Sequence, residues 1–158
     1  MSQPVAEFRQ PTAADIDALA AGMRQQDVAE LQALGHTDLR HVVQTSVSAS
    51  AWCRSVYVGD ELGCIFGLAK IGTVLAPIGI PWMLGTPLVR THRRILAKLA
   101  PAYIRAMLQE APHLMNMVHA HNTVAVQWLK HVGFHLHPAT PQGPRGEPFH
   151  LFEMTAHV

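Results

Sequence analysis

The chain has 158 residues, of which 49% are hydrophobic and 15% charged, so it can bury a core within one domain over residues 1–158. The formal net charge of +1 provides no general attraction to nucleic acid or to an anionic membrane. Cys53 and Cys64 lack the C-x-x-C spacing of redox or metal motifs. The alternatives are a disulfide bridge and two free, buried thiols, and we expect the free thiols, as suits a reducing cytoplasm.

The first part of the chain predicts helices followed by a hairpin. Thr12 is followed by Asp15 three residues later, a pattern typical of a capping box at a helix start. A Gly-Asp-Glu turn separates two β-rich runs further on. The predicted elements are a strand over 6–10, helices over 13–33 and 37–50, and a hairpin over 55–71.

An uncharged run of nineteen positions, 71–89, is nearly long enough to cross a bilayer. It contains three prolines and three glycines, which break a helix. Two short buried strands joined by turns explain the run better than a membrane span does.

The second part of the chain alternates helices with strands. A long amphipathic segment is followed by a strand, and a short helix begins at Asn122 as its N-cap and ends before Gly133 in a left-handed conformation. The predicted elements are helices over 91–112 and 122–133, strands over 113–120, 134–138 and 149–156, and a Pro/Gly-rich loop over 138–148.

A strand, Asn-x-x-Ala, a short helix and Gly-Phe follow one another with fixed spacing; the residues are Val118, Asn122, Ala125, Val126, Leu129, Gly133 and Phe134. This stretch, together with the opening "FRQPTAADIDAL", resembles the Gcn5-related N-acetyltransferase (GNAT) superfamily. The resemblance implies a single-domain α/β fold, with a mixed, mostly antiparallel sheet flanked by about four helices. It also implies acyl transfer from acetyl-CoA.

The resemblance also implies where acetyl-CoA would lie. The cofactor would wedge between two splayed strands, "PWMLGT" and "LMNMVHA", with its phosphates at the start of the following helix. The candidate cofactor-binding residues are Leu84 and Gly85 through their backbone, Arg90, Arg93 and Arg94 through their charges, and Asn122 beside the pantetheine arm.

Two departures from the superfamily pattern argue against CoA binding and catalysis. Arg93 and Ile95 occupy positions where the superfamily places small residues that leave room for the pyrophosphate. Leu129 occupies the position of a tyrosine that protonates the departing thiolate. The arginines could hold phosphate as point charges, or the helix could bind no CoA and present a solvated basic face. The catalytic residues are not identified; acid–base work would fall to a histidine or to Tyr103.

The back half of the chain, including the ending "GEPFHLFEM", resembles more narrowly the internal virion protein A group of T7-like podophages. That resemblance implies a phage protein in the bacterial host cytoplasm or packaged in the virion. It would act in virion assembly through other virion proteins, as a catalytically degenerate acetyltransferase. The alternatives are an active acetyl-CoA-dependent N-acyltransferase on a protein or small amine, and a nucleic-acid contact through the basic helix.

Histidines cluster in two H-x-H pairs, His119 with His121 and His135 with His137. Each pair would share a strand face, but no Cys, Asp or Glu lies near either pair in sequence to complete a zinc site. We therefore predict no metal.

Overall fold

A mixed sheet of eight strands runs through residues 4–157, the part of the chain described by this computed structural model. The strand order is β1-β2-β3-β4-β5-β8-β6, with β7 paired to β8, and only the β4–β5 pair is parallel. The predicted α/β class with a mixed, mostly antiparallel sheet is confirmed. The strands are β1 (Ala6–Arg9), β2 (Ser50–Val58), β3 (Glu61–Gly72), β4 (Pro77–Gly85), β5 (His113–His119), β6 (His135–Leu136), β7 (Thr140–Gln142) and β8 (Glu147–Thr155).

The described residues form six helices rather than about four: α1 (Ala13–Gly22), α2 (Gln25–Ala33), α3 (Leu39–Ala49), α4 (Leu88–Thr91), α5 (Arg93–Glu110) and α6 (Thr123–His131). The predicted helix over 13–33 is wrong in one respect, because the backbone is extended at Met23 and Arg24. The Arg24 N–H leaves the helical pattern and donates to the Gly85 carbonyl at 2.8 Å. A tertiary bond to β4 therefore ends α1 and starts α2.

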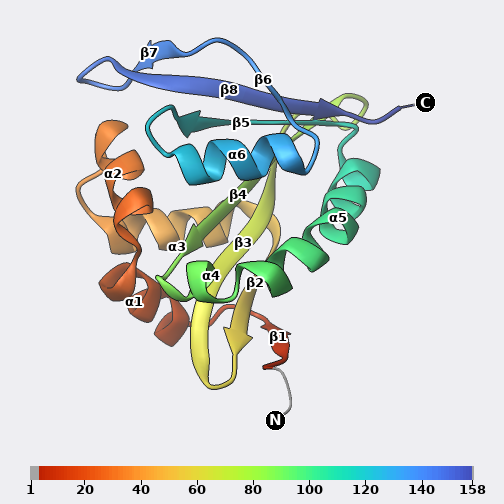
Figure 1. The fold of residues 1–158 in the computed structure, drawn as a ribbon. Helices are drawn as coiled ribbons and strands as arrows, with labels where there is room; N and C mark the ends of the chain where they lie inside the picture. Colours follow the sequence, from red (N-terminus) through yellow and green to blue (C-terminus); the bar gives the residue numbers. More distant parts are fainter. Residues whose placement is uncertain (1–3, 158) are drawn as a thin grey trace.

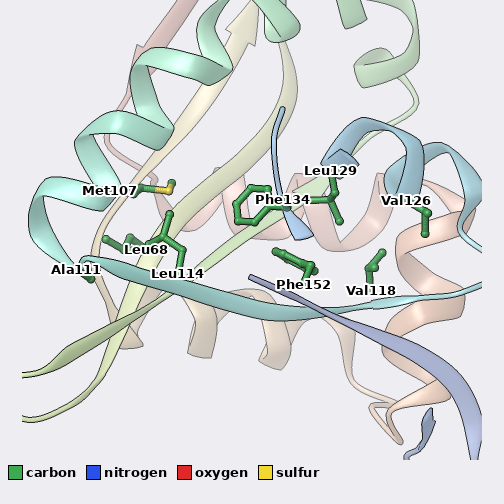
Figure 2. Packing of buried hydrophobic residues seen from close by; sticks show 9 residues of the cluster. All are labelled: Leu68, Met107, Ala111, Leu114, Val118, Val126, Leu129, Phe134 and Phe152. Atoms are coloured by element: carbon green, nitrogen blue, oxygen red, sulfur yellow. The ribbon is translucent and has the colours of Figure 1, made fainter. Parts of the chain in front are cut away.

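The helices cover the two faces of the sheet. On the first face, α1 and α3 enclose a core that includes Leu19, Val43 and Ile65. On the second face, α5 and α6 pack over a separate core. Figure 2 shows Met107 and Leu114 of that core near α5, and Leu129 above Phe152 under α6.

The sheet parts in its middle. β4 and β5 pair only at Ile78 with His113 and at Gly79 with Leu114. Figure 1 shows β5 and β8 running across the molecule at an angle to β3 and β4. The two strands therefore diverge towards the C-terminal end of β4, where backbone groups need partners other than a neighbouring strand.

Several local predictions are confirmed. Thr12 and Asp15 form the capping box of α1. Gly59 turns the β2–β3 hairpin at φ 64°, and Gly133 follows α6 at φ 107°, both left-handed values that favour glycine. Cys53 and Cys64 are free and buried.

The predicted loop over 138–148 is wrong in part, because Thr140–Gln142 form β7 and pair with the start of β8. Prolines argue against a strand because they lack an N–H. β7 lies off the main strand path, where a missing donor is tolerated.

The uncharged run over 71–89 forms the end of β3, a turn, β4 and the start of α4. No helix among residues 4–157 has the length and apolar character needed to span a membrane.

Gly79 sits where β4 and β5 part, and a Cβ there would lie 2.6 Å from Leu114 Cδ2 and 2.9 Å from Leu68 Cδ1. Both leucines are fully buried. We expect Gly79→Ala to lower the free energy of unfolding by ~1–3 kcal/mol through overpacking, measured by urea denaturation. Gly22→Ala is the matched control, since nothing lies within 4 Å of its added Cβ. Equal stability of the two variants would contradict this packing.

Candidate functional site

A cavity of about 400 Å³ lies where β4 and β5 diverge, and side chains from both faces of the sheet line it. Leu31 and Leu34 reach it from the first face. Leu96, Tyr103 and Leu129 reach it from the second face. The cavity therefore joins the two sides of the sheet through the gap between the strands.

The inner edge of β4 is mostly satisfied by the chain itself. The Pro81 carbonyl accepts a hydrogen bond from Asn116 Nδ2 at 2.9 Å. The Gly85 N–H donates to Asp27 Oδ2 at 2.8 Å, and its carbonyl accepts from the Arg24 N–H. Strand backbone groups alternate sides, so the N–H and C=O of Met83 face the same gap as those of Pro81 and Gly85.

Leu84 and Gly85 were predicted to contact the cofactor through their backbone, but this alternation places their backbone groups on opposite sides of β4. Leu84 lines the cavity with its side chain, while its backbone groups face β3. Gly85 is at the predicted place, but both its backbone groups are already engaged within the chain. Met83, which the sequence analysis did not select, presents a donor and an acceptor beyond the last β4–β5 pair.

Asp27 holds the end of β4 in place. Besides the Gly85 N–H, its Oδ2 accepts from Arg24 Nε at 2.7 Å. The two side chains are only 17% (Arg24) and 5% (Asp27) exposed, so the ion pair is shielded from water. Asp27 is therefore a paired structural carboxylate that links α2 to β4.

Glu30 lies in the cavity wall without a bonded cation among the described residues. Its Oε1 accepts from the His119 N–H at 3.2 Å, and its Oε2 accepts from Asn122 Nδ2 at 3.3 Å. Burial raises the pKa of the Glu30 carboxyl, and the nearby Asp27 charge adds to the effect. Glu30 thus combines a desolvated carboxyl with a position at the cavity.

The His119 ring beside Glu30 has a hydrogen-bond partner at each of its two nitrogens. Its Nδ1 accepts from the His121 N–H at 3.1 Å, so Nε2 carries the hydrogen and donates to Glu147 Oε1 at 3.0 Å. This bond holds the pKa of the Glu147 carboxyl below its usual value. His119 thus contacts Glu30 through its backbone N–H, while His121 and Glu147 hold its ring.

Asn122 caps α6 as predicted, with its Oδ1 accepting from the Ala125 N–H at 3.3 Å. Its Nδ2 is occupied by Glu30. Asn122 is buried and lines the cavity. It was predicted as a cofactor-binding residue, and its side chain contacts Glu30, which was not predicted.

Arg90, Arg93 and Arg94 come together as the sequence analysis expected. They line an open depression of about 520 Å³ at the start of α5, and all three are exposed. No side chain among the described residues caps this helix, whose N-cap is His92. The depression therefore gathers positive charge beside an uncapped helix start.

Leu129, which replaces the tyrosine of the superfamily pattern, and Tyr103, a candidate proton donor, both line the cavity. Leu129 points into the core and cavity wall, so its position carries no acid. Tyr103 lines the cavity but packs among aromatic rings, with its ring centroid 5.3 Å from that of Phe8 and 4.8 Å from that of Phe66. Burial raises the pKa of Tyr103 and so keeps its hydroxyl protonated.

The tertiary structure brings carboxylates to the histidines that the sequence left without them. Glu153 on β8 contacts His113 Nε2 at 2.9 Å and His137 Nε2 at 3.0 Å. The His113 bond, then the His137 bond, lower the pKa of the Glu153 carboxyl. Within residues 4–157, no group of three or more His, Cys, Asp or Glu side chains is arranged to hold a metal ion.

Comparison with solved structures identifies the fold. The chain is similar to an acetyltransferase of the GNAT family from Bacillus anthracis, at a TM-score of 0.69 and 12% identity over 98% of this chain and 96% of that one. The chain has the GNAT fold. It is also similar to Ard1 from Thermoplasma volcanium (TM-score 0.72, 11% identity, 97% and 99% covered). Aminoglycoside acetyltransferase AAC(6′)-Ib in complex with coenzyme A is a further neighbour (TM-score 0.68, 14% identity, 96% and 95% covered).

These identities establish the GNAT fold alone. No family model matches the sequence, and no curated protein matches it closely.

Sequence reasoning missed Arg24, Asp27, Glu30 and Met83. Asp27 and Glu30 are three residues apart and share a helical face that continues to Leu31. Two acidic residues beside an apolar residue on one helical face were the sequence pattern that could have indicated Asp27 and Glu30. Met83 had none, because a backbone donor leaves no trace in a side-chain pattern.

The raised pKa of Glu30 predicts how stability depends on pH. A carboxyl whose pKa is higher in the folded state binds more protons folded than unfolded, so its contribution to stability falls as pH rises above about 4.5. We expect the stability difference between Glu30→Gln and the unmodified chain to shift in favour of the variant from pH 4.5 towards 7. Urea unfolding across this range measures it, and a difference that stays constant would contradict the assignment.

Asn122 provides a second stability test. Asn122→Ala removes both the cap and the Glu30 contact, and we expect a loss of ~0.5–2 kcal/mol. Asn122→Ser keeps a capping oxygen and should recover most of the cap's contribution. Thermal and urea unfolding compare the two variants, and unchanged stability of Asn122→Ala would show that the cap contributes nothing.

Proposed function

We propose that this chain is an acyl-CoA-dependent N-acyltransferase. The supporting observation is the Met83 backbone, whose N–H and C=O face a cavity that crosses the sheet where β4 and β5 diverge. Such groups can bind an extended amide chain as a neighbouring strand would. The pantetheine arm of CoA is an extended chain with two amides.

The remaining candidate residues fit the other parts of the cosubstrate. Arg90, Arg93 and Arg94 would attract its phosphates at the start of α5, as point charges and without the close backbone approach that glycines allow. The Leu84 side chain would form part of the wall, and Asn122 would border the arm. Neighbouring structures in complex with coenzyme A or acetyl-CoA support this use of the fold.

The chemistry needs little from an acid at position 129. Acetyl-CoA supplies a thioester, and a neutral amine attacks its carbonyl carbon. The Met83 C=O would accept from an amide N–H of the pantetheine arm, which leaves the Met83 N–H to donate to the thioester oxygen as negative charge develops there. The leaving group is a thiolate, whose conjugate acid has a pKa of about 8.5, so it departs near neutral pH without full protonation. Leu129 in place of tyrosine is therefore compatible with turnover.

A second proposal keeps the narrower sequence resemblance: a catalytically degenerate GNAT-fold protein that acts in virion assembly. It rests on the back half of the chain and the "GEPFHLFEM" ending. The solved structures named above are acetyltransferases and do not bear on it. Mass spectrometry of purified particles tests it, and absence of the chain from particles that assemble normally without it would refute it.

Met83→Pro tests the backbone donor directly. The Met83 N–H faces the gap, so proline removes it without removing a β3–β4 ladder bond, as Pro81 already shows two residues earlier. We expect acetyl-CoA to bind at least about tenfold more weakly by calorimetry, consistent with loss of one well-placed hydrogen bond. Met83→Leu keeps the donor and should bind normally. Equal binding by both variants, or no acetyl-CoA binding by the unmodified chain at millimolar concentration, would refute the proposed site.

The arginine depression gives a salt-dependent prediction. Replacing both Arg90 and Arg94 by alanine should weaken acetyl-CoA binding by about five- to tenfold at low salt, because two exposed phosphate contacts are lost. The difference should shrink near 1 M salt, where screening is strong. Arg105→Ala on the same helix is the control and should bind normally. An effect that is the same at both salt concentrations would argue against phosphate contacts.

A further inference from the structure

The lining of the cavity is apolar on the first face, where its exposed residues Leu34 and His36 reach the surface. Leu31 and Leu34 of the α2 region and Val42 of α3 line it there, with Leu34 itself 36% exposed. His36 and Ser46 are the polar residues beside them. No carboxylate is among these five residues, so a cation entering past them would meet no opposite charge until it reached the interior.

Glu30 lies in the wall of the same cavity. The other acid in the cavity wall, Asp27, is neutralised by Arg24 and occupied by Gly85. Within residues 4–157, the bonds to Glu30 come from an amide and a backbone N–H, and no Lys or Arg side chain is bonded to it. The interior therefore offers one carboxylate that lacks a bonded Lys or Arg among the described residues.

From this arrangement we propose that the acyl acceptor is a primary amine carried on an apolar body, that it enters from the first face between α2 and α3, and that Glu30 is the base that removes its proton. This proposal rests on the proposed acyltransferase function. The cosubstrate would occupy the second face, because the arginine depression lies at the start of α5, which packs on that face. The acyl acceptor would then enter the cavity from the first face.

The step balances as follows. The Glu30 carboxylate takes one proton from the ammonium group, giving a neutral amine. The nitrogen lone pair forms a C–N bond to the thioester carbonyl carbon, the C–S bond breaks, and its electron pair leaves with sulfur. The nitrogen's second proton passes to the thiolate, giving the amide and free CoA thiol. Glu30 then releases its proton to water.

Asn122 is a positioning residue in this scheme. Its Nδ2 donates to Glu30 Oε2, while its own orientation is fixed by the cap bond to Ala125. The Asn122–Glu30 bond therefore couples the cap of α6 to the orientation of the Glu30 carboxylate. The raised pKa of Glu30 is consistent with a base that works near neutral pH.

Polycationic acceptors fit poorly on this face of the cavity. An additional ammonium group among Leu31, Leu34 and Val42 would lose hydration without gaining a partner. In its acceptor this chain would therefore differ from the aminoglycoside acetyltransferase whose fold it shares.

A substrate panel tests the acceptor class. Release of free CoA thiol from acetyl-CoA is measured with 2-phenylethylamine and tryptamine as apolar amines, and with spermidine and kanamycin as polycations. We expect kcat/KM to be at least about tenfold higher for the apolar amines, as a buried apolar ring contributes about 1.5–3 kcal/mol. Equal or higher values for the polycations would overturn the acceptor class.

The pH profile of Glu30→Gln tests the base. At pH 7 we expect kcat to fall about a hundredfold or more, in the range of a lost general base, with acetyl-CoA affinity unchanged. The deficit should shrink towards pH 10, where the amine loses its proton without help. Glu61→Gln, at the exposed start of β3, is the control and should keep full activity. A deficit that is the same at every pH would assign Glu30 a structural role instead.

Leu34→Glu is a gain-of-function test of the same proposal. It does not require that any Glu30 variant folds. A carboxylate at this position should raise kcat/KM for spermidine relative to 2-phenylethylamine by about fivefold or more, in the range of one exposed ion pair. An unchanged ratio would show that acceptors enter elsewhere. Failure of the proposed function looks different: no acetyl-CoA binding and no thiol release with any amine.

Discussion

The end of β4–β5 pairing after Gly79 is the constraint on which the rest of the site depends. Two central strands of the sheet part there, so their inner backbone groups lose the partners that a continuous sheet would supply. The chain answers with side chains: Asn116 bonds to the Pro81 carbonyl, and Asp27 to the Gly85 N–H. Met83 lies between these two and faces the cavity. The cavity occupies the part of the gap between β4 and β5 that these hydrogen bonds leave open.

α2 supplies hydrogen-bond partners to both of the strands that part, β4 and β5. Its N-cap, Arg24, bonds to the Gly85 carbonyl, and Asp27 in its first turn bonds to the Gly85 N–H. One turn later, Glu30 accepts from the backbone of His119 on β5. A single short helix therefore spans the gap, and the carboxylate that bonds to β5 is also the one that we propose as the base. The structural and chemical roles of Glu30 cannot be separated by stability alone, which is why pH-dependent rates distinguish them.

As the phosphate site that we propose, the arginine depression differs in kind from a glycine loop. A glycine loop places backbone N–H groups close to the pyrophosphate, which gives short, directed bonds that salt screens weakly. Arg90, Arg93 and Arg94 are exposed side chains, whose attraction acts over longer range and weakens with salt. Cosubstrate affinity in this chain should therefore depend more on ionic strength and less on backbone geometry.

The sequence by itself determined the features that are local. The Thr12–Asp15 capping box, the β2–β3 hairpin, the Asn122 cap and the turn at Gly133 each depend on residues a few positions apart, and all were predicted correctly. The order of most strands and helices followed from such local patterns, whereas the α/β class came from the resemblance to the GNAT superfamily.

Only the tertiary structure decided the features that depend on contacts between distant segments. The break after α1 exists because Arg24 bonds to Gly85, sixty-one positions later in the chain. β7 forms because β8 provides an edge to pair with, despite prolines that disfavour a strand. The chemistry of Glu30 arises from burial against His119 and Asn122, and the role of Met83 from the side of the strand that its backbone faces. Periodicity and capping rules act within a few residues, whereas desolvation and strand divergence are properties of the assembled sheet.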